Sequence, residues 1–209
     1  MVEILSVKEE KPDSEKLERA AKVLKNGDLV IYPTETVYGI ATDATSDEAT
    51  AKVFKAKARP LEKPISAAVD SLSMSYYVGK VTSQEEILIE EFLPGPLTVL
   101  VEARPAVSEI LSAGTGKIGI RIPDNSVALE LIKTVGGPIT STSANVSGSP
   151  APARLDEAID QLEKHVELAL DVGELPIGEP STVVDVTGED IRILREGPIS
   201  KSDIRSVLK

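Results

Sequence analysis

A run of basic residues is the part of this chain whose side chains most plainly suggest chemistry. Between positions 52 and 63 five cations accompany one acid, a local net charge of +4 in a chain whose formal net charge is −11. These residues are Lys52, Lys55, Lys57, Arg59 and Lys63, with Glu62 as the acid. Pro60 predicts that a helix stops just before it, so the last cations lie where the backbone leaves the helix. The cluster favours an anion site, and the alternative is the solvated face of a helix.

Three further groups of polar residues are associated with predicted strands. Residues 32–39 combine hydroxyls and a glutamate at a strand end, where α/β sheets usually bind ligands. Residues 141–148 concentrate hydroxyls, an amide and a glycine, which can donate hydrogen bonds to phosphate or ribose. Ser181 opens a late strand and Arg195 closes the next. Each group alone is as typical of a polar turn as of a ligand-binding site. A binding site is therefore predicted only from the groups taken together.

Several kinds of chemistry are excluded by residue type. The chain has no cysteine and one histidine, which rules out thiolate catalysis and multi-histidine metal sites and argues strongly against a Ser-His-Asp triad. We expect His165 to point to solvent from a helix over residues 155–166. Residues 114–117 resemble the end of a phosphate-binding P-loop, but Leu111 and Ile118 stand where that motif needs Gly and Ser or Thr.

The elements that must position these groups alternate between strands and helices. Capping residues and apolar spacing predict a helix between Asp13 and Gly27, and others over 46–57, 83–93, 125–135, 155–166 and 200–208. Strands are predicted over 28–32, 65–69, 97–101, 118–122, 138–142, 167–172, 182–186 and 191–194. This alternation indicates an α/β fold, and the strands clustered near the C-terminus favour a mixed sheet. We expect one domain over residues 1–209.

Composition sets limits on location and partners. Hydrophobic residues make up 41% of the chain, and no apolar stretch approaches the roughly 18 residues of a membrane span. The N-terminus shows no signal peptide, so we expect a cytoplasmic protein with no membrane partner. The net charge of −11 argues against broad adhesion to nucleic acid, but it leaves room for a groove that takes one nucleotide or one tRNA end.

Taken together, these segments resemble the YrdC-like threonylcarbamoyl-AMP synthases, in family order along nearly the whole chain. The matching pieces are PTETVYG at 33–39, KARP at 57–60 with KP at 63–64, LPGPLT at 93–98, GIRIP at 119–123, SAN at 143–145, STVVD at 181–185 and REG at 195–197. The resemblance implies an open, twisted mixed sheet flanked by helices, with a basic concave cleft. It also implies a nucleotidyltransferase that joins L-threonine, bicarbonate and ATP into threonylcarbamoyl-adenylate and pyrophosphate.

In that family the product serves the N6-threonylcarbamoyl modification of adenosine 37 in tRNA, so tRNA or a downstream transfer complex is an expected partner. Mg²⁺ is expected to arrive with ATP, and no protein metal site is implied. Carried over by motif, Lys57 and Arg59 are the expected catalytic residues. The expected ATP ligands are Arg59, Lys63, Lys117, Ser143, Asn145 and Arg195. The expected L-threonine ligands are Thr36, Arg121, Ser141 and Ser181.

Some positions depart from the family pattern. Lys117 stands where relatives often have a threonine near ATP, and Ala68 where some place a polar residue near threonine. The chain is also expected to lack the extra C-terminal domain of the longer members. Arg121 suits a carboxylate because its planar fork donates two parallel hydrogen bonds, and the alternative is an ion pair with a neighbouring acid.

Two other functions are consistent with the same motifs. One is a YrdC-like module that binds double-stranded RNA or tRNA without making the adenylate. The other is a carbamoyl-transfer relative of the hydrogenase-maturation proteins, which carry this domain inside much longer chains.

Overall fold

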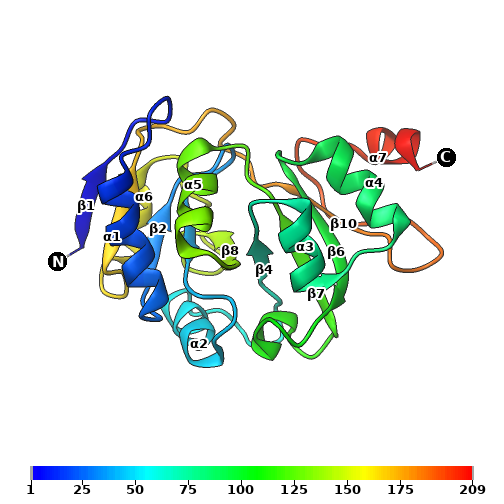
Figure 1. Ribbon diagram of the computed structural model, residues 1–209, viewed down its shortest axis with the longest axis horizontal. Coiled ribbons are helices and arrows are strands. Elements are labelled where there is room, and N and C mark those ends of the chain that lie inside the picture. Colours follow the sequence, from blue (N-terminus) through cyan, green and yellow to red (C-terminus); the bar gives the residue numbers. More distant parts are fainter. Residues whose placement is uncertain (1, 209) are drawn as a thin grey trace.

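One mixed sheet runs through the molecule, here described from a computed structural model that covers residues 2–208 (Figure 1). Its strand order is β1-β9-β2-β3-β8-β4-β7-β6-β10-β11, and β5 pairs with β6. The strands are β1 (Glu3–Ser6), β2 (Val30–Tyr32), β3 (Gly39–Ala41), β4 (Ser66–Ala68), β5 (Gly79–Lys80), β6 (Leu97–Ala103), β7 (Lys117–Arg121), β8 (Ile139–Ser143), β9 (Leu168–Asp171), β10 (Thr182–Asp185) and β11 (Arg192–Arg195). The predicted α/β fold with a mixed sheet is therefore confirmed.

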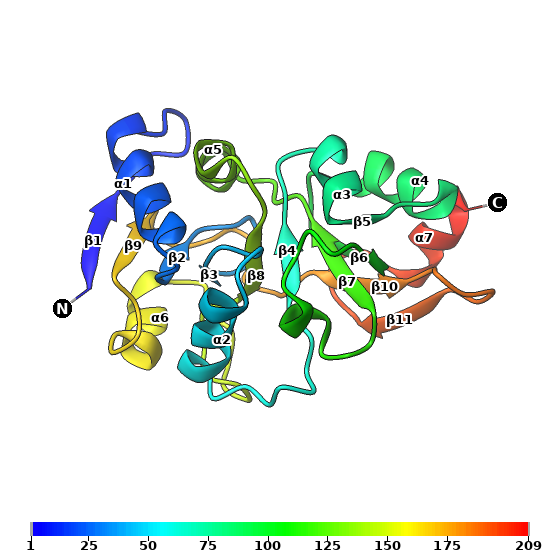
Figure 2. The same cartoon turned by 60° about the horizontal axis from the view of Figure 1, so that its bottom comes forward.

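Helices cover both faces of this sheet. They are α1 (Ser14–Lys25), α2 (Asp47–Ala56), α3 (Leu72–Val78), α4 (Ser83–Phe92), α5 (Ser126–Val135), α6 (Leu155–Leu162) and α7 (Lys201–Val207). Helices α1, α5, α3 and α4 lie along one side, whereas α2 and α6 lie on the other, below the half that contains β1, β9 and β2 (Figure 2). No helix among residues 2–208 is both long and apolar enough to span a bilayer.

Strand β8 joins the two halves of the sheet because it changes partner along its length. Its first residues pair with β4, in the register Ile139 with Ala68 and Ser141 with Ser66. Its last residues pair with β3, where Thr142 faces Ile40 and Ser143 faces Gly39. The sheet therefore divides at the polar residues 141–143, much as α/β sheets open a crevice where strand connections diverge.

Local sequence explains the elements that were predicted well. Asp13 caps α1 by accepting hydrogen bonds from the backbone N–H groups of Glu15 and Lys16. Leu17 and Leu24 of α1 are buried against α5, as their helical spacing requires. Strand β2 is buried throughout: Ile31 packs into one apolar cluster and Tyr32 into the cluster on the other face.

The end of α2 sends the basic segment in a new direction. The N–H of Ala58 bonds the carbonyl of Lys55, and the N–H of Arg59 bonds the carbonyl of Phe54 at 2.9 Å. These two bonds form a Schellman motif, with Ala58 in the left-handed position that usually holds glycine (φ 45°). Pro60 follows and cannot continue the helix, so Lys57 and Arg59 leave the helix end in different directions.

The remaining differences from the prediction involve short or irregular elements. Strands β1, β3 and β5 and helix α3 were not predicted, because two to four residues carry too little periodicity and α3 mixes serines with aromatics. The helix predicted over 155–166 ends at Leu162, so His165 lies in the following turn. The prediction that His165 faces solvent is confirmed.

Candidate functional site

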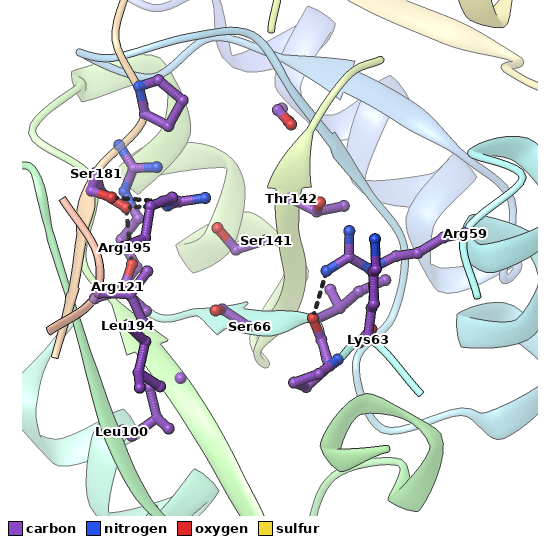
Figure 3. A pocket seen from close by; sticks show the side chains of 18 of the residues that line it. Arg59, Lys63, Ser66, Leu100, Arg121, Ser141, Thr142, Ser181, Leu194 and Arg195 are labelled. Atoms are coloured by element: carbon purple, nitrogen blue, oxygen red, sulfur yellow. Dashed lines mark hydrogen bonds between the residues drawn. The ribbon is translucent and has the colours of Figure 1, made fainter. Parts of the chain in front are cut away.

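A cavity of about 560 Å³ opens where the two halves of the sheet divide (Figure 3). One wall is the sheet face made by β7, β6, β10 and β11, and the other is the loop that follows α2. Eight of the eleven predicted site residues line it: Arg59, Lys63, Lys117, Arg121, Ser141, Ser143, Ser181 and Arg195. Its size falls in the range of small-molecule sites. The separate motifs of the sequence therefore meet in one place.

Strand alternation places the sheet-wall residues on one face. Every second residue of β7 lines the cavity, which brings Lys117, Gly119 and Arg121 into one row. Gly119 faces Leu100 of β6, and a Cβ atom on it would lie 2.4 Å from the Ser66 hydroxyl oxygen. A larger residue at 119 would therefore displace Ser66 from the cavity floor.

Arg121 is held by the loop that follows β2. Its Nη2 donates to a carboxylate oxygen of Glu35 at 3.0 Å, to the Thr36 hydroxyl, and more weakly to the Thr34 hydroxyl at 3.4 Å. The Thr34 hydroxyl in turn donates to the carbonyl of Val37 at 2.7 Å. The ion pair that the sequence offered as an alternative is therefore present. Arg121 forms this ion pair and also lines the cavity.

Arg195 is anchored on the neighbouring strand. Its Nε donates to the backbone carbonyl of Ser181 at 2.9 Å and its Nη2 to the Ser181 hydroxyl at 3.0 Å, and that hydroxyl lies 2.9 Å from the Thr98 hydroxyl. Gly197 permits this approach, since a Cβ there would lie 2.5 Å from the carbonyl oxygen of Pro180. Ser181 and Arg195, which sequence reasoning grouped only by their places at two strands, are thus in direct contact (Figure 3).

The loop wall carries Arg59 and Lys63. Arg59 is half-buried and donates from Nε to the carbonyl of Lys63 at 2.9 Å and from Nη2 to the carbonyl of Pro64 at 2.8 Å. The guanidinium therefore closes its own loop and also lines the cavity. The loop thus wraps the side chain of Arg59, unlike a cation on a solvated helix face.

Lys57 has a different environment from Arg59. It is only 1% exposed, and its ammonium donates to the carbonyls of Ser143 and Asn145 and to the Asn145 side-chain oxygen. Burial, aided by the charge of Arg59, lowers the pKa of Lys57 to about 7. Lys57 does not line the cavity. It fastens the loop that presents Ser143.

Two other predicted residues also lie behind the cavity surface. Thr36 is fully buried and accepts a hydrogen bond from Arg121. Asn145 is 6% exposed, and its amide nitrogen donates to the carbonyl of Ser149 at 2.7 Å. In this structure these two side chains support residues that line the cavity.

Lys117 forms an ion pair across the far end of the cavity. Its ammonium lies 2.7 Å from a carboxylate oxygen of Asp185, whose other oxygen accepts from the backbone and hydroxyl of Thr187. Burial alone would raise the pKa of Asp185, but the hydrogen bonds from Lys117 and Thr187 outweigh it and lower the pKa. Asp185 belongs to the STVVD motif but was not predicted as a site residue.

Positive charge is crowded in this cavity. Arg195 keeps an exposed surface, yet partial desolvation, followed by the charges of Arg121 and Arg59, lowers its pKa. Desolvation likewise lowers the pKa of Arg59. Cations that repel one another beside a cavity are stabilised when an anion enters, so the arrangement suits a ligand with several negative charges.

Other lining residues were missed by sequence reasoning. Leu100, Val183 and Leu194 add an apolar surface to the sheet wall, and Leu194 is 57% exposed. Leu100 and Val183 lie two residues after Thr98 and Ser181, and this spacing was a usable signal for β6 and β10. Leu194 directly precedes Arg195, so alternation gave no signal for it. In residues 2–208 no group of three or more His, Asp or Glu side chains is arranged to hold a metal ion.

The fold and the cavity together define an α/β protein with a cationic small-molecule site at a divided mixed sheet. A family model for the Sua5, YciO and YrdC proteins, described as telomere recombination, matches residues 22–197. The chain belongs to this family.

Named relatives extend this assignment. A threonylcarbamoyl-AMP synthase of Pyrococcus abyssi is 33% identical over 209 residues, which cover all of this chain and 61% of that protein. A putative threonylcarbamoyl-AMP synthase of Mycobacterium tuberculosis is 38% identical over 90% of this chain and 87% of its own length. The crystal structure of P. abyssi Sua5 complexed with L-threonine superposes with a TM-score of 0.94 at 32% identity, over 98% of this chain and 60% of that one. The chain thus spans about three fifths of the P. abyssi protein.

Proposed function

We propose that this protein is a threonylcarbamoyl-AMP synthase, a nucleotidyltransferase that forms threonylcarbamoyl-adenylate and pyrophosphate from L-threonine, bicarbonate and ATP. One observation carries the proposal: a single cavity contains both Arg121, whose fork suits an amino-acid carboxylate, and the loop cations Arg59 and Lys63, which suit a triphosphate. The solved P. abyssi Sua5 complex contains L-threonine, and we extend that ligand to this chain.

In this reaction the protein need not supply a nucleophile. The amino group of threonine forms a bond to the carbon of bicarbonate, a C–O bond of bicarbonate breaks and water leaves, which gives a carbamate. A carbamate oxygen then attacks the α-phosphorus of ATP. The bond from that phosphorus to the bridging oxygen breaks, and pyrophosphate leaves. The protein positions the two substrates and neutralises phosphate charge. A chain without cysteine can do both.

The side chains divide these tasks. Arg59 and Lys63 would contact the β- and γ-phosphates, with Ser143 and Arg195 near the α-phosphate. Arg121, Ser141 and Ser181 would hold threonine and its carbamate, while Lys57, Asn145 and Thr36 keep the liganding groups in place. Mg²⁺ enters as part of the nucleotide substrate, bound by phosphate oxygens. tRNA modification would consume the product, and we propose the cytoplasm as the location.

The test is pyrophosphate release with each substrate omitted in turn, with the product identified by mass. Release should require ATP, L-threonine and bicarbonate together, and serine should be a poor substrate because one methyl contact is worth about 1 kcal/mol. Lys133→Ala is a suitable control, since Lys133 pairs with Glu130 on the exposed side of α5 and does not line the cavity. Release without threonine, or none with all three substrates, would reject the proposal.

A further inference from the structure

The cations of the cavity fall into two classes according to their counter-ions. Among residues 2–208, Arg121 pairs with Glu35 and Lys117 pairs with Asp185. Arg59, Lys63 and Arg195 form no ion pair within 4.0 Å in the described chain, and the hydrogen bonds of the two arginines go to backbone carbonyls and to the Ser181 hydroxyl. Positive charge is therefore compensated at some places in the cavity and left free at others.

The Arg121–Glu35 pair is the more deeply buried of the two. Both of its side chains are 8% exposed, whereas Lys117 is 37% exposed. Only one Glu35 oxygen is used. The other oxygen is buried and, within the described residues, has no hydrogen-bond partner. The carboxylate therefore neutralises Arg121 and is not shared with another cation.

Such a pair discriminates between ligands by charge. A single carboxylate from an amino acid can bind Nη1 of Arg121, because Nη2 is engaged with Glu35, Nε is buried, and the ligand adds little net charge. A phosphate group carries close to two negative charges and would lie near the buried Glu35 carboxylate. Repulsion between the phosphate and the Glu35 carboxylate is strong in a partly desolvated site. Arg59 and Lys63 have no paired carboxylate and therefore attract the same phosphate.

We propose that Glu35 is a specificity-determining residue that keeps phosphate groups out of the amino-acid end of the cavity. It acts by cancelling the charge of Arg121, so the β- and γ-phosphates of ATP bind beside Arg59 and Lys63 and the threonine carboxylate binds beside Arg121. This inference rests on the proposed function for the identity of the amino acid, but the exclusion of phosphate follows from the charge pattern itself.

The test is calorimetric titration of L-threonine, without Mg²⁺, into protein with and without saturating pyrophosphate. In the unaltered protein, pyrophosphate should change the threonine Kd less than about twofold. In Glu35→Gln, pyrophosphate should compete and raise the apparent threonine Kd at least about tenfold. Glu35→Asp keeps the charge and should behave like the unaltered protein. Asp185→Asn is the matched control. It removes the carboxylate that pairs with Lys117 at the far end of the cavity, and it should create no competition between pyrophosphate and threonine.

Two outcomes overturn the proposal: displacement of threonine by pyrophosphate in the unaltered protein, or no competition in a folded Glu35→Gln. Should Glu35→Gln fail to fold, the unaltered protein and Glu35→Asp still decide, since both must bind threonine and pyrophosphate together. If threonine binds to no variant, the proposed function fails. Pyrophosphate alone then tests Glu35, and a second pyrophosphate should bind Glu35→Gln but not the unaltered protein.

Discussion

The two walls of the cavity hold their cations in different ways. On the sheet wall, Arg121 and Arg195 are fixed by side chains and carbonyls from neighbouring strands and loops. On the loop wall, Arg59 is fixed mainly by carbonyls of its own loop, and Lys63 extends from that loop. Groups on strands are held more accurately than groups on loops. The sheet wall thus suits a ligand that must be oriented, and the loop wall suits one that must be neutralised.

The largest expected effect comes from Lys57, which ties the end of α2 to Ser143 and Asn145 at the end of β8. In Lys57→Met the buried carbonyls of Ser143 and Asn145 lose their donor, so the free energy of unfolding should fall by about 2–4 kcal/mol. Urea denaturation measures the loss, and pyrophosphate release should fall as well because Ser143 is no longer held. Lys55→Met, on the exposed side of the same helix, is the control. Equal stability of the two variants would mean that Lys57 does not anchor the loop.

Removing a cation from the loop wall should impair turnover. Under the proposed function, Arg59→Ala should lose a charge-assisted phosphate contact, which should cost about 2–4 kcal/mol in transition-state stabilisation. Pyrophosphate-release kinetics measure this loss, and thermal unfolding should show a much smaller change than in Lys57→Met. Normal turnover with a lowered melting temperature would instead make Arg59 a structural residue.

The sheet wall should respond to geometry more than to charge. Arg121→Lys keeps the charge but loses the fork, so threonine affinity should fall at least about tenfold, about 1.4 kcal/mol, while ATP affinity changes little. Separate titrations of threonine and ATP measure both quantities. Unchanged threonine affinity in Arg121→Lys would indicate that this position contributes only its charge, as residues that contact RNA phosphates do.

The last effect is gradual, a pH dependence of stability due to Lys57 that is small for each pH unit. Its pKa is about 7 in the folded protein and about 10.4 in the unfolded chain, so the unfolded state binds more protons between these values. Stability should therefore rise with pH across that window, by at most about 1.4 kcal/mol per pH unit from this residue. Urea denaturation between neutral and alkaline pH should give a steeper rise than in Lys57→Met. Equal slopes would contradict the lowered pKa.

Much of the fold could be predicted because its signals are local. Asp13 as a cap, the apolar spacing of α1 and the stop at Pro60 each act within a few residues. The partner change of β8 could not be predicted, since it depends on how distant strands pack. Strand β3 was missed because three residues after a polar motif show no alternation.

The candidate site divides in the same way. Motif order predicted the eight residues that now line one cavity. It did not distinguish Lys57 from Arg59, because the left-handed turn at Ala58 decides which cation faces inward. It also did not pair Glu35 with Arg121, since an ion pair between residues 86 positions apart has no signal in a single sequence.

The path of the chain through the sheet has a consequence for folding during synthesis. Strand β2 is completed by β9, where Ile31 pairs with Ala169, and β6 is completed by β10, where Leu100 pairs with Asp185. In each half of the sheet, a strand made early therefore lacks one of its partners until a much later part of the chain has been synthesised. Until the ribosome has released both, the nascent chain exposes unpaired strand edges, and we expect it to depend on protection from aggregation during that interval.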